Sequence, residues 1–592
     1  MTRGTEDPVR DRDPGPDVRT DEESGDRSGE GPGHDGSART GATADEDGDG
    51  AGDAPEVSRW SGAGVVARIR RDVTEWLLGV AIGVWCVVFG RLIWQRHARF
   101  ATFDFDLGHH DQAIWLLAHG KGFITVSGMP VLGHHLTLAY FGVAPLYWLG
   151  GGPQLLDLLQ TAALALGAVP IYLLARHRLG NPWWALALGL AWLLNPSVQW
   201  LCWEAWHPET MAIPFLLAAY LFASRQQWRW YWVALVLALS WKEDISIAVA
   251  VLGVVLALSG RRRRGLLTLA VGVLWFLMAY GIVMPHFNGG TNHAGIFYGD
   301  LGSSPTELVR TAVTDPTAVL GRLRDNDALG YARDLLAPFG FLPLLAPGLV
   351  AIAVPQFFAN SLTTANFFYD IRFHYTAIIL AALAIAMVEG IAVLRRDGWR
   401  RFGVGLVAAS ALATSVAWGI SPISTQYRTG YWPLAGNARQ DVLEAAVDTV
   451  PGDAPVAATY YIVPHLTHRQ FAYTFPNPWI PANWGVHGEA PHDPASDHLP
   501  VDVEWLVVDR TTHTPGSREE RLLDDLLFGG EFDVVSDEQG IVVARRVSAE
   551  PVRELPSQTT TTTTTSPAIA TTGPTTTVPG VVTPGGGGAG SP

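Results

Sequence analysis

The chain has 592 residues, of which 48% are hydrophobic and only 16% are charged, against about 25% charged residues in an ordinary soluble domain. The formal net charge of −15 is concentrated in residues 1–56, where 17 acidic residues and 6 arginines contribute −11 and leave −4 elsewhere. The charge therefore gives no indication of a nucleic-acid partner. The only cysteines, Cys86 and Cys202, exclude a disulfide framework as the architecture.

Many windows of the chain are almost wholly apolar over about 20 residues, the length that spans a hydrocarbon core. This pattern predicts a polytopic, all-α membrane domain over residues 73–420. The first apolar run begins only near Val73, so we expect no N-terminal signal peptide. The partners expected from composition are membrane lipids.

Both ends of the sequence are expected to be disordered. Residues 1–72 form an acidic segment rich in Asp, Glu, Gly, Pro and Ser, with too few large apolar side chains to offset the loss of chain entropy. Residues 551–592 are rich in Thr, Pro and Gly, and the low-complexity stretch itself begins at residue 556. Their composition predicts a tail at each end rather than a packed domain.

Clusters of arginine set the expected topology, because basic loops stay on the cytoplasmic side. An even number of crossings must then separate one cluster from the next, and the N-terminus is cytoplasmic. Arg91, Arg96 and Arg99 disagree with this scheme, since they follow the first span on its outer side. The clusters used are Arg68/Arg70/Arg71, Arg176/Arg178, Arg225/Arg229, Arg261–Arg264 and Arg395/Arg396/Arg400/Arg401.

This rule predicts about 11 crossings in the plasma membrane, with the chain leaving the last one on the extracytoplasmic side. The run 136–149, which contains Pro145, is expected to be a half-inserted helix on the outer face. The expected crossings are 75–94, 153–175, 182–198, 209–224, 229–241, 245–259, 265–285, 331–346, 348–362, 371–394 and 401–420.

Residues 421–550 change character and predict a small extracytoplasmic α/β domain, because helical and strand-like patterns alternate there. The expected helices are 437–449 and 517–528. The expected strands are 456–459, 503–508, 532–535 and 541–547.

Five polar groups fall on the outer side of this topology, and ionisable residues near membrane depth are by default candidates for function. They are Asp104/Asp106/Asp111 near His109 and His110, His134/His135, Glu204/His207/Glu209, Lys242/Glu243/Asp244, and Arg372/His374. We expect these groups to converge on one site.

Each group also has a structural explanation. The Asp104–Asp111 acids could be solvated loop residues, and Lys242, Glu243 and Asp244 could pair with one another at a hairpin tip. His134 and His135 could satisfy a helix N-terminus or form a metal pair, although no further ligand spacing supports a metal.

The remaining two groups differ, because one favours a structural interpretation and the other favours ligand binding. Pro208 suits the first position of a helix, which would place Glu209 in the favoured first turn. Arg372 at a helix start opposes the helix dipole, which favours a phosphate or carboxylate partner for it.

An outer carboxylate can act as a general base on an acceptor hydroxyl. Lys, Arg and His side chains nearby can hold a phosphate leaving group as its charge develops. A lipid-phosphate donor would reach such a site laterally from the bilayer, which is the physical logic of a lipid-linked glycosyl transfer.

Several motifs in order resemble an uncharacterised family of bacterial multi-pass membrane proteins, catalogued as a domain of unknown function, over about residues 75–547. They are Phe105–Gly108, Asp111–Trp115, Gly133–His135, His207–Glu209, Lys242–Asp244 and Arg372–Tyr375. That family in turn distantly resembles the C-type glycosyltransferases, which use polyprenyl-phosphate sugars. The resemblance implies that Asp106 takes the place of the acid in the first outer loop and Glu209 that of the second acid.

The leading hypothesis is a glycosyltransferase that moves a sugar from a polyprenyl phosphate to a cell-envelope acceptor, with Asp106 as base and Lys242, Arg372 and His374 on the phosphate. The alternatives are a transporter or flippase of a lipid-linked or small anionic solute, and an envelope assembly protein. The sequence assigns no metal ligands and requires no cofactor, and it leaves a divalent metal open.

Overall fold

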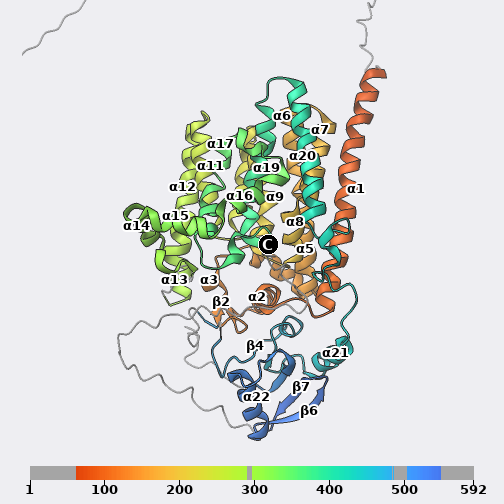
Figure 1. The fold of residues 1–592 in the computed structure, drawn as a ribbon, viewed down its shortest axis with the longest axis vertical. Coiled ribbons are helices and arrows are strands. Elements are labelled where there is room, and N and C mark those ends of the chain that lie inside the picture. The colour runs from red at the N-terminus through yellow and green to blue at the C-terminus, as the bar shows by residue number, and fades with distance from the viewer. Residues whose placement is uncertain (1–61, 290–296, 483, 486–502, 548–592) are drawn as a thin grey trace, which may run out of the picture. The chain divides into compact units, whose positions relative to one another are not determined.

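The computed structural model describes residues 62–289, 297–482, 484–485 and 503–547. These residues form a bundle of helices joined to a sheet near the C-terminus (Figure 1). The tails expected to be disordered lie outside the described residues, except that helix α1 (Gly62–Ala98) begins within the segment 1–72.

Five helical stretches of the described chain are long and apolar enough to cross a membrane. A sixth exists if α7 (Pro182–Leu194) and α8 (Pro196–Trp203), which bend by 44° at their junction, form one span. The prediction of a multi-pass membrane protein is confirmed, whereas the count of 11 crossings is not. The five stretches are Val73–Ala98, Pro153–Leu179, Arg262–Phe287, His374–Ala392 and Asp397–Trp418.

Three shorter apolar helices, α9 (Pro208–Ser224), α10 (Trp228–Leu239) and α11 (Ile245–Leu258), agree with the expected segments to within two residues. They contain 17, 12 and 14 residues. At about 1.5 Å per residue, each is shorter than a hydrocarbon core of about 30 Å. Length alone therefore does not make them spans.

The crossings expected over 331–346 and 348–362 are not single continuous helices. Prolines interrupt both segments, because proline lacks the backbone N–H and clashes with the preceding turn. The expected half-helix 136–149 is also split, at Ala144. The pieces are α16 (Ala328–Leu336), η6 (Ala337–Phe339), η7 (Leu342–Leu345), α17 (Pro347–Val350), α18 (Val354–Ser361), α4 (Tyr140–Val143) and η2 (Ala144–Leu149).

Helix α19 (Ala377–Ala392) lies at the centre of the bundle and is buried on every side from Ala377 to Ile391. Its sequence is apolar all round except for Glu389, which is buried and forms an ion pair with Arg178, and this composition suits an enclosed helix. The 3₁₀ turn η9 (His374–Thr376) precedes it directly. The position of His374 is therefore fixed by the most enclosed helix of the bundle.

The remaining helices complete the bundle and cover the sheet. They are α2 (His109–Ala118), α3 (Val131–His134), α5 (Pro153–Leu166), α6 (Ala168–Leu179), α12 (Arg262–Met278), α13 (Met284–Phe287), α14 (Pro305–Thr314), α15 (Pro316–Asp325), α20 (Asp397–Trp418), α21 (Gln440–Thr449) and α22 (Arg518–Phe528). Helices α11 and α12 approach each other very closely at Gly253. A Cβ atom added to this glycine would lie only 2.3 Å from the backbone nitrogen of Leu269.

The C-terminal sheet has five strands in the order β4-β3-β5-β7-β6. Strand β3 pairs in parallel with β4 and β5, whereas β7 pairs antiparallel with β5 and β6. The small α/β domain predicted from the alternating pattern is present. Its strands are β3 (Val456–Ala458), β4 (Ala472–Thr474), β5 (Trp505–Asp509), β6 (Phe532–Glu538) and β7 (Ile541–Arg546).

A short hairpin of β1 (Phe123–Ile124) and β2 (Met129–Pro130) joins the helical bundle to the sheet domain. The indole Nε1 of Trp484 donates a hydrogen bond of 2.8 Å to the carbonyl of Thr125. A Cβ on Gly128, which has a φ of +68°, would lie only 2.8 Å from that indole. This contact defines the domain end of the bundle, meaning the end that carries the sheet.

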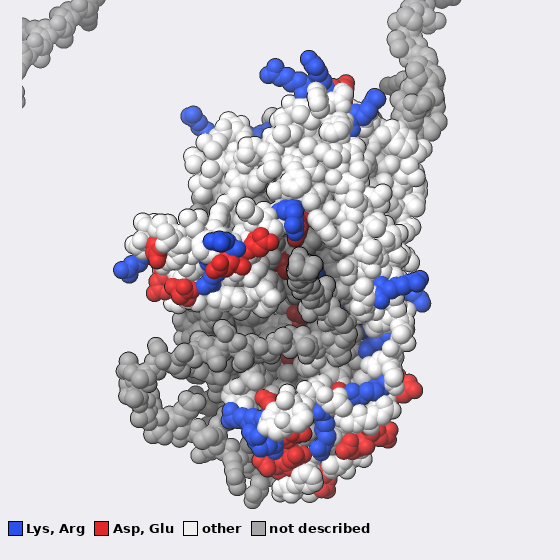
Figure 2. Space-filling view, viewed as in Figure 1, with Lys and Arg blue, Asp and Glu red and all other residues white. Residues whose placement is uncertain are grey.

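Figure 2 shows lysine and arginine side chains at the end of the bundle remote from the sheet, next to a band with few charges, and charged residues of both signs beyond that band, beside α14 and α15 and on the sheet domain. Helices α6 and α11 end, and α12 and α20 begin, at the end remote from the sheet (Figure 1). Arginines stand at these termini, including Arg176, Arg178, Arg262 and Arg396. An uncharged belt between charged ends is what a bilayer-spanning bundle requires.

Candidate functional site

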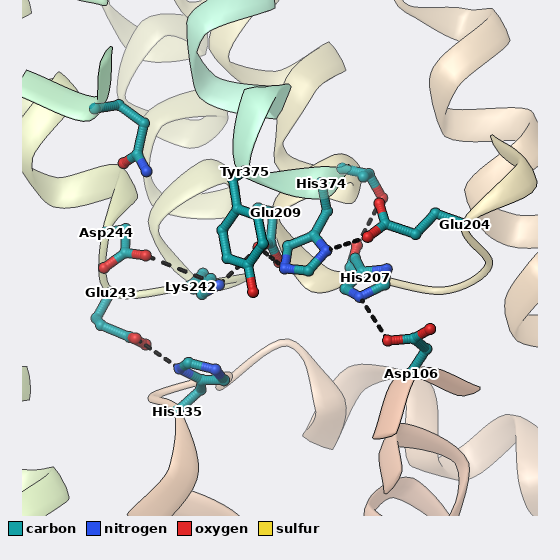
Figure 3. A network of polar contacts seen from close by, with 12 residues as sticks. Asp106, His135, Glu204, His207, Glu209, Lys242, Glu243, Asp244, His374 and Tyr375 are labelled. Carbon is teal, nitrogen blue, oxygen red and sulfur yellow. Dashed lines mark hydrogen bonds and ion pairs between the residues drawn. The ribbon is translucent and has the colours of Figure 1, made fainter. Parts of the chain in front are cut away.

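Polar side chains from five separate segments meet at the domain end of the helical bundle (Figure 3). The segments are the π-helical turn η1 (Asp104–Gly108), the residues after α3, the loop leading into α9, the turn between α10 and α11, and the turn η9. We call these side chains the polar cluster: Asp106, His135, Glu204, His207, Glu209, Lys242, Glu243, Asp244, His374 and Tyr375.

Of the three acids that follow α1, only Asp106 faces the polar cluster. Its Oδ1 lies 3.5 Å from Nε2 of His207, and its side chain is 31% exposed. The π turn around it matters, because such turns are rare and often occur at functional sites. Asp106 is thus a carboxylate that solvent or a substrate can reach.

The other two acids point toward the sheet domain. Asp104 is buried and accepts a hydrogen bond of 2.6 Å from Thr474 Oγ1. Asp111 is fully buried, and its oxygens accept hydrogen bonds from Tyr147 at 2.6 Å and Thr467 at 2.5 Å. These acids therefore join the bundle to the sheet domain, and the expectation that they share one site with Asp106 is wrong.

The start of α9 has the form expected from its sequence. Pro208 occupies the first helical position, and Glu209 lies in the first turn. A buried glutamine holds the loop before it, because Gln160 Oε1 accepts hydrogen bonds of 2.6 Å from the backbone N–H of His207 and from Thr210 Oγ1. Gln160 is a positioning residue for His207.

The three charged residues of the turn 242–244 contact different partners. Lys242 Nζ lies 2.6 Å from Glu209 Oε1 and 3.8 Å from Asp244 Oδ2. Tyr280 donates a hydrogen bond of 2.6 Å to Asp244 Oδ1. The three residues do not simply pair with one another, so they do more than cap a hairpin.

Glu243 binds the segment after α3. Its Oε1 lies 2.7 Å from His135 Nδ1, and its Oε2 accepts a hydrogen bond of 3.0 Å from the backbone N–H of Leu136. His134 turns the other way and lies 3.0 Å from His109, nitrogen to nitrogen. His135 therefore belongs to the polar cluster, whereas His134 contacts His109 instead.

His374 connects the two acids of the 204–209 segment. Its Nδ1 lies 2.7 Å from Glu204 Oε1, and its Nε2 lies 3.6 Å from Glu209 Oε1. Its ring stacks on His207 with centroids 3.7 Å apart and 15° between planes. Tyr375 stands beside it, with its hydroxyl pointing into the middle of the polar cluster (Figure 3).

Arg372 does not join the polar cluster. It forms a bidentate ion pair with Asp370, donates a hydrogen bond of 3.1 Å to the Tyr431 hydroxyl, and lies 6.0 Å from the Trp200 ring centroid. It also precedes the turn η9 rather than starting a helix, so the argument from the helix dipole does not apply. Arg372 thus has protein partners outside the polar cluster, and its assignment to a phosphate stays a prediction.

Electrostatics within the polar cluster favour the charged forms of some side chains despite burial, whereas burial raises the pKa of Glu204 and Asp244 and favours their neutral forms. Burial disfavours the imidazolium of His207, but the carboxylates of Glu204 and Asp106 raise its pKa to about 9. Burial likewise opposes ionisation of Glu243, and His135 lowers its pKa to about 2. Burial also opposes the charge on Lys242, but Glu209 raises its pKa above the ordinary value.

The sequence did not predict that Gln160 and Tyr375 take part in the site. Gln160 lies inside an apolar helix, where a side-chain amide without hydrogen-bond partners costs free energy. This cost is the feature of the sequence that could have identified Gln160. Tyr375 ends the motif Arg372–Tyr375, but the sequence assigns it no role. Neither contact could be predicted, because Gln160 and Tyr375 reach residues that are distant in the chain.

This arrangement combines a reachable carboxylate with buried cations and imidazoles at the end of a membrane bundle. Asp106 can accept a proton from a hydroxyl. Lys242 and the imidazoles can donate to an anionic oxygen. The chemistry open to these groups is transfer or binding of an anionic, phosphate-like substrate.

The chain is similar in three dimensions to two crystal structures of ArnT from Cupriavidus metallidurans, one bound to undecaprenyl phosphate and one in the apo state. The first has 14% sequence identity and a TM-score of 0.48 over 80% of this chain and 99% of the other. The second has 15% identity and a TM-score of 0.47 over 80% and 98%.

No curated protein matches the chain. One family model does match, over residues 96–543, which include the helical bundle except for most of α1, the polar cluster and nearly all of the sheet domain. The expected membership of an uncharacterised membrane-protein family is confirmed: the chain belongs to the family described as predicted membrane protein DUF2079.

Proposed function

We propose that this protein is an integral-membrane glycosyltransferase that moves a sugar from a polyprenyl-phosphate donor to a cell-envelope acceptor. The reaction takes place at the domain end of the bundle, on the extracytoplasmic face. Asp106 acts as the general base, and Lys242 with the imidazoles of His135 and His374 receives the phosphate.

The arginines support this orientation. Arg176, Arg178 and Arg262 stand at helix termini remote from the sheet domain, and basic residues favour the cytoplasmic side. The three arginines that disagree with the rule include two with structural tasks. Arg96 donates a hydrogen bond of 2.8 Å to the Trp203 carbonyl, and Arg99 donates one to the Pro433 carbonyl. Both are held at the domain end by these contacts.

The observation that carries the proposal is the position of Asp106. A general base must reach the proton that it removes, and Asp106 is partly exposed while Asp104 and Asp111 are enclosed by hydrogen-bond donors. The buried Lys242 lies in the same cluster and carries N–H groups that can donate to a phosphate oxygen. The proposed base and the proposed phosphate-binding lysine thus belong to one cluster.

The test uses the full chain in lipid nanodiscs with radiolabelled polyprenyl-phosphate sugars and a cell-envelope fraction as acceptor. Asp106→Asn should reduce transfer by about 10²- to 10⁴-fold, the usual contribution of a general base. Asp300→Asn is the matched control, since this acid belongs to an exposed ion pair with Arg322 outside the polar cluster.

Transfer at an unchanged rate by Asp106→Asn would remove this residue as the base. A wild-type chain that binds a polyprenyl phosphate, transfers no sugar and moves the lipid between leaflets would replace the proposal by a flippase. Mass spectrometry of lipids that copurify with the protein reports on the donor class in either case.

A further inference from the structure

Glu204, His207 and His374 bring one carboxylate and two imidazoles together from two distant parts of the chain. Their ligand-type oxygen and nitrogen atoms all lie within 4.8 Å of one another. Glu204 and His207 come from the loop between α8 and α9, and His374 comes from the turn before α19. Helices on both sides therefore hold the backbones of the three residues, while their side chains can turn.

Two buried carboxylate oxygens in this region lack a protein partner. Glu204 and Glu209 are each only 4% exposed. Oε2 of both residues has no hydrogen-bond partner among the described residues. Buried carboxylate oxygens are normally satisfied by donors or by an ion. Each residue thus offers an acceptor in a place that water hardly reaches.

The charges within the polar cluster also favour binding of a cation. Its acidic members are Asp106, Glu204, Glu209, Glu243 and Asp244. Within the cluster, as far as the structure describes it, Lys242 is the only lysine or arginine. An anionic phosphate entering this space meets more carboxyl groups than fixed cations, and Lys242 is already paired with Glu209, so its entry is unfavourable wherever those carboxyl groups are ionised. A cation that neutralises the carboxylates would remove the conflict.

We infer that Glu204, His207 and His374 bind a divalent transition-metal ion of the zinc type, with one coordination position left open for a phosphate oxygen of the donor. The inference rests on the proposed function for the ligand in the open position. Two imidazoles with one carboxylate form a set that catalytic zinc sites use, and they leave the fourth position to water or substrate. Imidazole ligands favour zinc and its neighbours over magnesium.

Metal binding requires a small movement of His374. Two ligands of one tetrahedral ion lie about 3.4 Å apart, whereas Glu204 Oε1 and His374 Nδ1 are 2.7 Å apart and the two imidazole rings are stacked. The ring of His374 must therefore turn away from the face of His207. Asp106, on the open side of His207, remains available as the base.

The sequence did not predict this site. Glu204 and His207 are three residues apart, but His374 lies 170 positions after Glu204, so no spacing motif contains all three ligands. In the sequence, the adjacent His134 and His135 were the histidines that most resembled a metal-binding pair. In the structure, His134 contacts His109 and His135 contacts Glu243 instead.

The experiment measures metal binding by the full chain, purified through a tag without histidines and stripped with a chelator. Zn²⁺ or Co²⁺ is added back, and the bound metal is counted by mass spectrometry. Wild type should bind about one ion per chain, and His374→Gln should weaken binding by about 100-fold or more, since it removes a direct ligand. His119→Gln, in an exposed histidine outside the cluster, should bind as wild type does.

Visible absorption of the Co²⁺ form provides a readout that does not depend on the variants folding equally well. Wild type should show the bands of a tetrahedral site with nitrogen ligands, and phosphate should shift them. No bound metal, or equal binding by wild type and His374→Gln, would overturn the inference.

Failure of the metal site and failure of the proposed function are distinguishable. A chain that binds one ion and transfers no sugar keeps the metal site and loses the function. A chelated chain that transfers sugar at the full rate keeps the function and overturns the metal site.

Discussion

The ammonium nitrogen of Lys242 lies 2.6 Å from Oε1 of Glu209, and both side chains are buried, at 7% and 5% exposure. The pair joins the turn after α10 to the first turn of α9. Two segments that both contribute to the polar cluster are thereby held together by one ion pair.

Removing one partner of this pair should destabilise the protein more than removing both. Lys242→Met leaves Glu209 buried without its cation, and Glu209→Gln leaves Lys242 with only Asp244, at a cost of about 3–5 kcal/mol each. The double variant should lose less than the sum, because neither uncompensated charge remains. Thermal unfolding in detergent measures this cycle. Additive losses would show that the pair contributes no coupling energy.

Asp104→Asn should stabilise the protein above neutral pH. Burial raises the pKa of Asp104 to about 7, compared with about 3.9 in an unfolded chain. Because the folded state holds its proton more tightly, the contribution of Asp104 to stability is complete below pH 4 and is lost as the pH rises to about 7. The asparagine variant lacks this loss.

The measurement for Asp104 is the melting temperature of wild type and variant at pH 5 and pH 8. The advantage of Asp104→Asn should be larger at pH 8. Equal differences at the two pH values would mean that the folded-state pKa of Asp104 is not raised. Thr474→Val is the companion variant, since it removes the hydrogen-bond donor and leaves the carboxyl in place.

Asp111→Leu should loosen the contact between the bundle and the sheet domain. The carboxylate accepts hydrogen bonds from Tyr147 and Thr467 and lies 3.1 Å from His468 Nε2. Leaving these buried donors unsatisfied costs about 1–3 kcal/mol. Hydrogen exchange should become faster in residues 463–474 and stay unchanged in α19. Faster exchange throughout the bundle would indicate general unfolding rather than a local role.

The proposed orientation predicts which positions a membrane-impermeant thiol reagent can reach in intact cells. In a background with Cys86 and Cys202 replaced by alanine, Thr449→Cys in the sheet domain should be labelled. Ser259→Cys, just after α11 at the end remote from the sheet, should be labelled only after the cells are opened. The opposite pattern would reverse the topology and place the polar cluster on the cytoplasmic side.

The sequence by itself determined much of the secondary structure. Helix α9 begins where Pro208 predicts, and α10 and α11 fall within two residues of their expected bounds. Long apolar runs and proline positions act locally, so they can be interpreted without knowing what packs against them. The segments 331–346 and 348–362 are hydrophobic enough for crossings, but their prolines interrupt the helical hydrogen bonds and break both segments into short pieces.

The tertiary structure alone decided which charged groups share a site. Asp104, Asp106 and Asp111 look alike in the sequence, but only Asp106 faces His207, and the other two face the sheet domain. Arg372 pairs with Asp370 outside the polar cluster, whereas Tyr375, which had no expected role, belongs to it. A sequence shows that a charge near the membrane needs a partner. The identity of that partner depends on helices that meet only after the chain has folded, because Glu204 and His374 become neighbours through packing and not through spacing.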